Sequence, residues 1–275
     1  MGLMLALDRG NDSLKVALFD SGTIAFRGRL EGERFEGRLR KLVLDAALGT
    51  IVSGRARLSP GDRRRLVRIV AESEVLEGAA YCSVVPGSTK EISRALARLG
   101  APGILEVDSG ILLPFRIAVE SPSKVGPDRL AAAAGVVAAG GREGIIVDAG
   151  TAVTVDVLAK TGFLGGAILP GRDLWYRALH EGTAALPLVS EAGGEIDPPG
   201  RNTREAILAG VRWGVVGAVK ELVARSRRHV SKEARVWVTG GGGAVIARYL
   251  GPHARYEKDL VFLGLHHLFE LNSRV

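Results

Sequence analysis

The chain has 275 residues, enough for one large domain or two of ordinary size, each with its own hydrophobic core. Its composition, 47% hydrophobic and 24% charged, is that of a globular protein. The single cysteine, Cys82, excludes an intramolecular disulfide and indicates a reducing compartment. Because Cys82 stands in an apolar stretch, we interpret it as a small buried side chain.

Neither a targeting segment nor a membrane span is expected. The apolar run Leu3–Leu7 is too short for the core of a signal peptide, and Leu130–Ala139 is too short to cross a bilayer. We therefore expect a cytoplasmic protein without a membrane partner. The net charge of +7 comes with arginine-rich stretches at 55–68 and 225–228, which would suit nucleic acid. Aromatic residues make up only 5%, so a base-stacking platform is missing, and solvated helix faces that attract anionic substrates are the preferred interpretation.

Three short strands open the chain, and the same plan recurs near its middle. Apolar runs bounded by turn residues predict strands at Leu3–Leu7, Leu14–Phe19 and Ile24–Leu30. In the rest of the first half, period and composition predict helices at Phe35–Leu48, Arg63–Ser73 and Lys90–Leu99, and strands at Ala79–Val85 and Gly103–Val107.

The second half begins with an alanine-rich helix pattern after Gly126 and then repeats the three-strand plan. The predicted strands are Ile145–Val147, Ala152–Leu158, Phe163–Ile168 and Arg235–Thr239. The predicted helices are Leu174–Ala185, Thr203–Arg228, Ala244–Leu250 and Leu260–Leu271. An internal duplication explains this repetition most simply.

An aspartate stands at the same point of both repeats. Asp8 and Asp148 each end an apolar strand and begin an Asp-x-Gly turn. The glycine of such a turn lets the backbone approach a ligand, carboxylates hold cations, and amide and hydroxyl groups hold phosphate oxygens. Two such hairpins facing one another would surround a phosphate chain. Each aspartate by itself is also ordinary turn chemistry.

Eight ordered blocks resemble the type III pantothenate kinases, a family of the superfamily that also contains acetate kinase, sugar kinases and actin. The blocks are DRGN (8–11), VGPDRLAAAAG (125–135), DAGTAVTVD (148–156), GFLGGAILPG (162–171), GTAALP (182–187), GRNTREAILAGVRWGVVGAV (200–219), VTGGG (238–242) and DLVFLGL (259–265). The resemblance implies an α/β protein with a duplicated ribonuclease H-like (actin-like ATPase) fold. Its two lobes, 1–118 and 119–275, would each contain a mixed β-sheet flanked by helices, with a cleft between them.

The resemblance also implies an activity and its site. The protein would phosphorylate pantothenate with ATP, the first step of coenzyme A biosynthesis, using Mg²⁺ and a monovalent cation, K⁺ or NH₄⁺. Asp128 would be the general base, Asp8 would bind magnesium and Asp148 the monovalent cation. ATP and its phosphates would be bound by Asp8, Gly10, Asn11, Asp12, Ser13, Lys15, Thr151, Gly240 and Gly241. Pantothenate would be bound by Gly126, Pro127, Asp128, Arg129, Thr183 and Thr203. The family's dimers, with the substrate pocket at the subunit interface, imply a homodimer.

Some of these residues would also fit purely structural roles. Asp128 could cap the alanine-rich helix, Arg129 could be a surface residue, and Gly240–Gly243 could be a flexible strand exit. The arginine clusters keep open a second function, a catalytically weak or inactive homologue acting as a transcriptional accessory factor. A third alternative is another kinase or phosphatase of the superfamily, which would not need the GPDR and Asn-Thr blocks found here.

Two positions depart from the family pattern. The family usually reads Asp-x-Gly-Asn-Thr, whereas Asp12 stands in place of the threonine and is followed by Ser13. A carboxylate there would repel phosphate, unless a cation bridges them or Ser13 or Lys15 makes the contact instead. Val119 stands where the family tends to have a tyrosine in the substrate pocket. Both changes predict an enzyme with raised requirements for ATP and pantothenate, or one with a slightly different substrate.

Overall fold

The computed structural model describes residues 3–32, 35, 37–43, 76–190 and 196–273. Contacts divide the chain into two compact units. Unit 1 consists of Met1–Phe115, Ser121–Ala139 and Leu260–Val275, and unit 2 consists of Arg116–Glu120 and Gly140–Asp259. The two predicted lobes, 1–118 and 119–275, stay a prediction about where the two repeats of the sequence meet.

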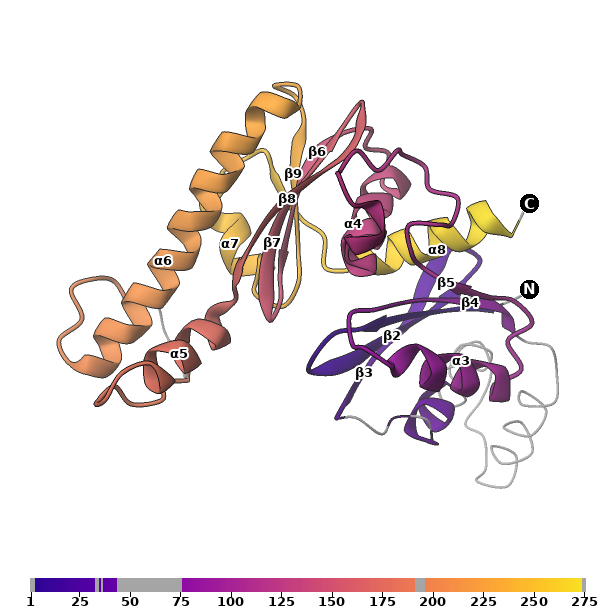
Figure 1. Ribbon diagram of the computed structural model, residues 1–275, viewed down its shortest axis with the longest axis horizontal. Helices are drawn as coiled ribbons and strands as arrows, with labels where there is room; N and C mark the ends of the chain where they lie inside the picture. The colour runs from indigo at the N-terminus through magenta and orange to yellow at the C-terminus, as the bar shows by residue number, and fades with distance from the viewer. Residues whose placement is uncertain (1–2, 33–34, 36, 44–75, 191–195, 274–275) are drawn as a thin grey trace, which may run out of the picture. The chain divides into compact units, whose positions relative to one another are not determined.

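Unit 1 is built on a five-stranded sheet with the strand order β3-β2-β1-β4-β5 (Figure 1). Its strands are β1 (Leu3–Arg9), β2 (Ser13–Asp20), β3 (Thr23–Glu31), β4 (Leu76–Ser83) and β5 (Ile104–Glu106). The strand β1 is buried along its whole length because it lies between antiparallel β2 and parallel β4. The edge strand β3 is the most exposed of the three opening strands, since a neighbour pairs with it on one side only.

Helices cover both faces of this sheet. The side chains of Leu3, Leu5 and Leu7 belong to a core cluster that includes helix α3 (Ser88–Arg98). The opposite face of β1 and β4 is contacted by α8 (Leu260–Asn272), and α8 packs on α4 (Pro127–Ala138). Because side chains alternate along a strand, Asp8 points to the face of α4 and α8.

Two further stretches of unit 1 are helical. Residues 37–43 form part of the helix predicted at Phe35–Leu48, and Pro122–Lys124 form a 3-10 turn, η1, ahead of α4. Phe35 is described and is buried ahead of this helical stretch. Residues 36 and 44–48 of the predicted helix, the helix predicted at Arg63–Ser73 and the arginine-rich stretch 55–68 lie outside the described residues.

Unit 2 repeats the plan with a second five-stranded sheet, ordered β10-β9-β6-β7-β8. Its strands are β6 (Gly144–Ala149), β7 (Ala152–Ala159), β8 (Gly162–Pro170), β9 (Arg235–Thr239) and β10 (Ala254–Tyr256). Counted within each unit, the strand order is 3-2-1-4-5 both times, with the first strand antiparallel to the second and parallel to the fourth. This identity of topology confirms the predicted duplication and the ribonuclease H-like fold.

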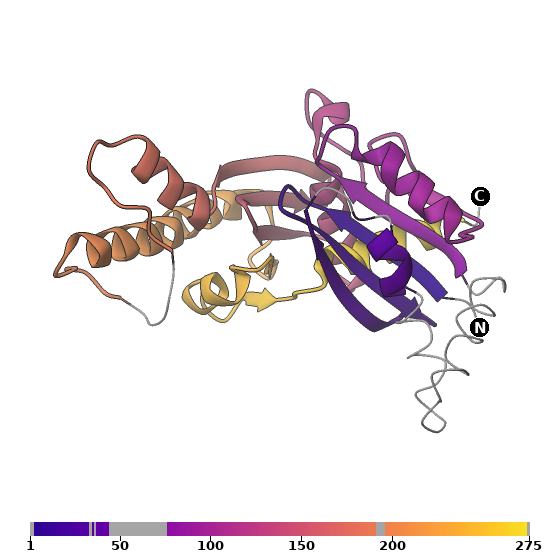
Figure 2. The same cartoon turned by 90° about the horizontal axis from the view of Figure 1, so that it is seen from below.

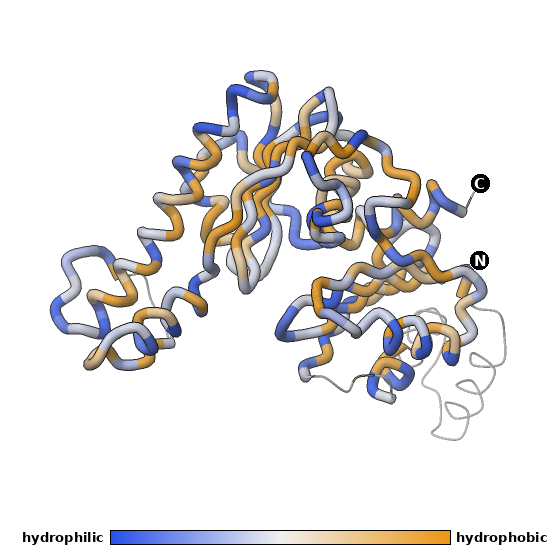
Figure 3. The backbone as a smooth tube through the Cα atoms, viewed as in Figure 1, coloured by the Kyte–Doolittle hydropathy of each residue, from blue (hydrophilic) through white to orange (hydrophobic). Residues whose placement is uncertain are grey.

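Three helices pack on one face of the second sheet. They are α5 (Arg172–Glu181), α6 (Thr203–Ser226) and α7 (Gly243–Tyr249), and a 3-10 turn, η2 (Arg227–His229), follows α6. Helices α5 and α6 lie side by side in both views (Figures 1 and 2). The apolar runs of the central strands stand out in Figure 3. Among the helices of the described residues, none has the length and hydropathy that crossing a membrane requires.

The observed strands and α-helices match the predictions from sequence, with one strand omitted. The bounds of β9 are those predicted, and α6 begins at the predicted Thr203. Both aspartates of the repeats, Asp8 and Asp148, lie inside their strands rather than after them. The short strand β10 was not predicted.

Candidate active site

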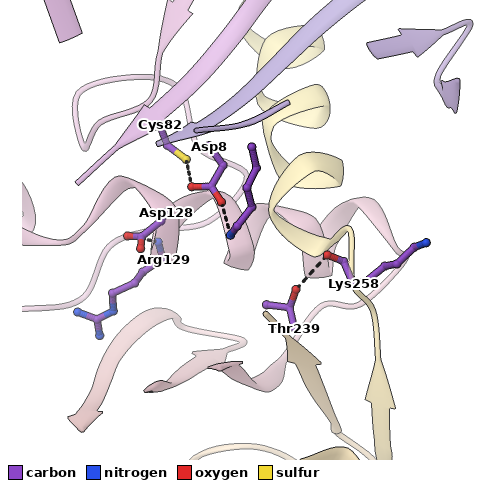
Figure 4. Close-up of polar contacts among 7 residues, drawn as sticks. Asp8, Cys82, Asp128, Arg129, Thr239 and Lys258 are labelled. Carbon is purple, nitrogen blue, oxygen red and sulfur yellow. Dashed lines mark hydrogen bonds and ion pairs between the residues drawn. The ribbon is translucent and has the colours of Figure 1, made fainter. Parts of the chain in front are cut away.

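Asp8 lies near the carboxyl end of β1, the central strand of the first sheet. The strand pairing places Lys15 of β2 opposite Asp8 on one side and Cys82 of β4 on the other. Lys15 Nζ donates to Asp8 Oδ2 at 2.9 Å, and Cys82 Sγ donates to Asp8 Oδ1 at 3.6 Å (Figure 4). Both carboxylate oxygens of a nearly buried aspartate are therefore bonded by neighbours within the sheet.

Asp128 lies in the first turn of α4, but it is not the N-cap residue. The N-cap residue is Gly126, without a side-chain cap, and Pro127 occupies the first helical position. Oδ1 of Asp128 accepts a hydrogen bond from the backbone N–H of Arg129 at 2.9 Å (Figure 4). A carboxylate in the first turn is favoured by the helix dipole. Asp128 is thus not the N-cap residue, but its carboxylate accepts one N–H of the first turn, so the capping alternative stays open beside the catalytic one.

The electrostatics of Cys82 connect Asp8 with Asp128. The pKa of the Cys82 thiol is raised well above its ordinary value, first by burial and then by the negative charges of Asp8 and Asp128, against the opposing charge of Lys15. The negative charges of both carboxylates therefore contribute to the raised pKa of this one thiol. Unit 1 brings together two of the three aspartates that the sequence singled out.

The other residues of the first hairpin surround the turn between β1 and β2. Gly10 N–H donates to the carbonyl oxygen of Ser13 at 3.1 Å, which closes the turn. Asn11 and Asp12 are exposed, whereas Ser13 is buried at the start of β2. The amide and carboxylate of the turn thus face solvent, and the hydroxyl of Ser13 is the one group of the three that lies in the interior.

The second hairpin is enclosed by two close backbone approaches within unit 2. A β-carbon added at Gly171 would lie 2.3 Å from the carbonyl oxygen of Gly150 and 2.5 Å from that of Thr151. One added at Gly240, where φ is +84°, would lie 2.4 Å from Asp148 Oδ1. Only glycine fits at these two positions. The predicted ATP residue Gly240 lies directly beside the predicted cation residue Asp148, and the backbone of Thr151 lies against Gly171.

Thr154 places a buried hydroxyl oxygen beside Asp148. Thr154 is its direct partner in the pairing of β6 with β7, and Thr154 Oγ1 is buried without a hydrogen-bond partner among the described residues. Such an oxygen beside a carboxylate matches the ligands that hard cations take. Thr239, paired with Asp148 from β9, instead donates to the carbonyl oxygen of Lys258 at 3.4 Å (Figure 4).

Within the residues that the structure describes, no group of three or more His, Cys, Asp or Glu side chains is arranged to hold a metal ion. Magnesium usually takes one or two carboxylates and completes its shell with water and substrate phosphates. Asp8 can supply one such carboxylate. Its Oδ2 is bound by the ammonium of Lys15, whose side chain is 44% exposed and can move away from this oxygen. The single carboxylate of Asp8 therefore suits a cation that arrives with a nucleotide.

The remaining predicted substrate residues have local roles in the structure. Thr183 Oγ1 donates to the carbonyl oxygen of Leu179 at 2.7 Å and closes the end of α5. Thr203 is exposed at the first position of α6, where Asn202 caps the helix by accepting from Glu205 N–H at 2.9 Å. Their contact with pantothenate stays a prediction.

Val119 packs against the edge of the second sheet. The segment 116–118 pairs beside β8, and a β-carbon at Gly165 would lie 3.2 Å from Val119 Cγ1. A side chain larger than valine at position 119 would have to turn away from Gly165 of β8. Valine in place of the family's tyrosine therefore changes the side chain that lies over β8 at this point.

The sequence did not predict one contact of the site, the hydrogen bond between Cys82 and Asp8. Cys82 is buried and free, as predicted, yet its thiol is also a hydrogen-bond donor to Asp8. The two residues are 74 positions apart, and no sequence signal joins them.

Comparison with known proteins identifies the family. A model of the type III pantothenate kinases matches residues 4–225. The chain belongs to the type III pantothenate kinase family. A type III pantothenate kinase of Dehalococcoides mccartyi is 31% identical over 98% of this chain and 96% of its own length. One of Chlorobium luteolum is 37% identical over 74% of this chain and 78% of its own length.

Solved structures support the fold. A protein of Campylobacter jejuni described as a Baf family transcriptional activator has a TM-score of 0.59 at 19% identity, over 98% of this chain and all of its own. Component A of (R)-2-hydroxyglutaryl-CoA dehydratase of Acidaminococcus fermentans has a TM-score of 0.52 at 14% identity, over 98% of this chain and 97% of its own. At these identities the likeness shows a shared architecture only. The predicted family and fold are thus confirmed, while the roles of individual site residues stay predictions.

Proposed function

We propose that this protein transfers the γ-phosphoryl group of ATP to a hydroxyl group of pantothenate and so begins coenzyme A biosynthesis. The observation that supports this most strongly is the family match over residues 4–225. This range contains Asp8 and Asp128, whose negative charges both raise the pKa of the Cys82 thiol. Kinase chemistry is mainly a matter of positioning the reactants and neutralising phosphate charge. A carboxylate takes part by holding Mg²⁺ or by accepting the proton of the attacking hydroxyl group.

Asp128 is proposed as the general base. A base must lie within hydrogen-bond reach of the attacking hydroxyl group. The carboxylate of Asp128, one oxygen of which accepts from Arg129 N–H, would take the proton of that hydroxyl. The guanidinium of Arg129, on the same helical turn, is proposed to pair with the carboxylate of pantothenate, because its planar fork matches a carboxylate. Gly126 and Pro127 fix the start of the helix that carries both side chains.

The two hairpins are proposed to hold the nucleotide. Asp8 would hold Mg²⁺, which neutralises phosphate charge, and Lys15 would move from Asp8 to the phosphates. Asp148 would hold K⁺ or NH₄⁺, with Thr154 Oγ1 as an additional oxygen beside it. The phosphate and nucleoside contacts would come from the turn residues Gly10, Asn11, Asp12, Ser13, Thr151, Gly240 and Gly241.

The family resemblance further supports a cytoplasmic homodimer as the working form. Sedimentation of the purified protein over a range of concentrations tests the oligomeric state. A monomer at all concentrations would contradict this part of the proposal.

A coupled assay for ADP release tests the activity. We expect ADP only when pantothenate, ATP, Mg²⁺ and K⁺ are all present, with Na⁺ in place of K⁺ as the matched control. ADP release that does not depend on pantothenate would contradict the proposal. Tight binding of duplex DNA without turnover would instead favour the transcriptional accessory factor.

A further inference from the structure

The carboxylate of Asp8 is held by two donors of different character. Lys15, Asp8 and Cys82 form one row across strands β2, β1 and β4, so their side chains lie on the same face of the sheet. The ammonium of Lys15 binds Oδ2 and the thiol of Cys82 binds Oδ1 (Figure 4). Each oxygen thus has its own donor from its own neighbouring strand.

These two donors differ in their freedom to move. The side chain of Lys15 is 44% exposed and has a flexible four-carbon stem, so its ammonium can leave Asp8 and follow another anion. Cys82 is completely buried, and its sulfur is one bond away from the β-carbon of a central strand. Lys15 is therefore the displaceable partner of Asp8, and Cys82 is the fixed one.

The thiol of Cys82 is placed to donate to Asp8. Its sulfur lies 3.6 Å from Asp8 Oδ1, and the whole side chain is buried within the sheet. A sulfur that solvent and reagents do not reach is inert as a nucleophile. The chemical role left for this thiol is to donate to Asp8.

We propose that Cys82 is a positioning residue, whose thiol holds Oδ1 of Asp8 so that Oδ2 is the oxygen presented to a divalent cation once Lys15 leaves. This inference rests on the proposed function, in which Asp8 meets the Mg²⁺ of the nucleotide. Without the thiol, the carboxylate is free to rotate and can offer both oxygens to Lys15. A divalent cation then has to displace Lys15 from a carboxylate that binds it with both oxygens.

Two substitutions separate hydrogen bonding from packing. Cys82→Ser keeps a donor and loses volume, whereas Cys82→Val keeps an apolar side chain of similar size and loses the donor. The probe is Mn²⁺, titrated in the presence of ADP and followed by the paramagnetic resonance signal of free Mn²⁺. We expect about 3- to 10-fold weaker Mn²⁺ binding in Cys82→Val, as for loss of a weak hydrogen bond to a charged group, and near-normal binding in Cys82→Ser.

Ala80→Gly is the matched control. Ala80 is as buried as Cys82 and lies on the same face of β4, but its partner on β1 is Ala6 rather than Asp8. We expect a lower melting temperature without a change in Mn²⁺ affinity. Should Cys82→Val fail to fold, Cys82→Ala removes the donor without adding a branched side chain and takes its place.

The opposite order of the two variants would overturn the proposal. If Cys82→Val binds Mn²⁺ like the wild type while Cys82→Ser is weakened, the sulfur serves packing alone. Because Mn²⁺ binding needs no turnover, its result is separate from that of the proposed function. A wild type without pantothenate-dependent ADP release would refute the function, and the order of the variants would still decide the role of Cys82.

Discussion

The crossing of α4 and α8 leaves no room for a side chain at Gly264. A β-carbon at this position would lie 1.7 Å from the carbonyl oxygen of Ala131 and 2.8 Å from the backbone nitrogen of Gly135. The first distance is half of the 3.4 Å at which ordinary contact begins. Because both atoms belong to the backbone of α4, no rotamer change can relieve the clash, and Gly264→Ala must push the two helices apart.

The cost follows from this geometry. Overpacking a well-packed interior costs about 1–3 kcal/mol, and a clash with helix backbone belongs at the upper end or above it. For a domain of this size, about 3 kcal/mol lowers the melting temperature by roughly 6–12 °C. The displaced helix also carries Asp128, so pantothenate-dependent turnover at a temperature where the variant is folded should fall as well.

Thermal unfolding followed by circular dichroism measures the first effect, and the ADP-release assay measures the second. Gly214→Ala is the control, since Gly214 lies within α6 and nothing approaches the place of its β-carbon within 4 Å. Alanine there should stabilise the helix by about 0.5–1 kcal/mol. A Gly264→Ala variant that melts and turns over like the wild type would refute the reasoning about this helix crossing.

Four further predictions concern single residues. Asp128→Asn should lower turnover about 10²- to 10⁴-fold with little change in melting temperature, because asparagine keeps the size of the side chain and an oxygen that can accept from Arg129 N–H; unaltered turnover would rule it out as the base. Asp148→Ala should weaken the dependence of ADP release on K⁺, and an unchanged K⁺ titration would remove it from the cation site. Asp12→Thr should lower the apparent KM for ATP by removing an exposed negative charge from the first turn, and abolished activity would instead make Asp12 a cation ligand. Burial lowers the pKa of His266, despite the raising effect of Glu270, so folding favours its neutral form and stability is lost as the pH falls below about 6.5. His266→Phe should therefore reduce the fall in melting temperature between pH 7.5 and pH 5. An equal fall in the variant and the wild type would contradict this.

Local pattern was sufficient for most elements and for the family. The strand Arg235–Thr239 and the start of α6 at Thr203 follow from apolar runs, turn residues and a helix cap, which act over a few residues. The strand β10 did not follow, because three residues are too few to show an alternating pattern. It forms because β9 supplies hydrogen-bond partners along its edge.

The two aspartate hairpins were also determined by the sequence itself, since a strand, an Asp-x-Gly turn and a second strand are consecutive in the chain. The pairing of Asp8 with Lys15 belongs to the same hairpin, seven residues apart. In contrast, the contact of Asp8 with Cys82 and the shared influence of Asp8 and Asp128 on that thiol depend on which strands become neighbours and which helix covers them. Sequence spacing carries no information about a distance of 74 residues along the chain, and only the packed sheet with its helices decides which side chains meet there.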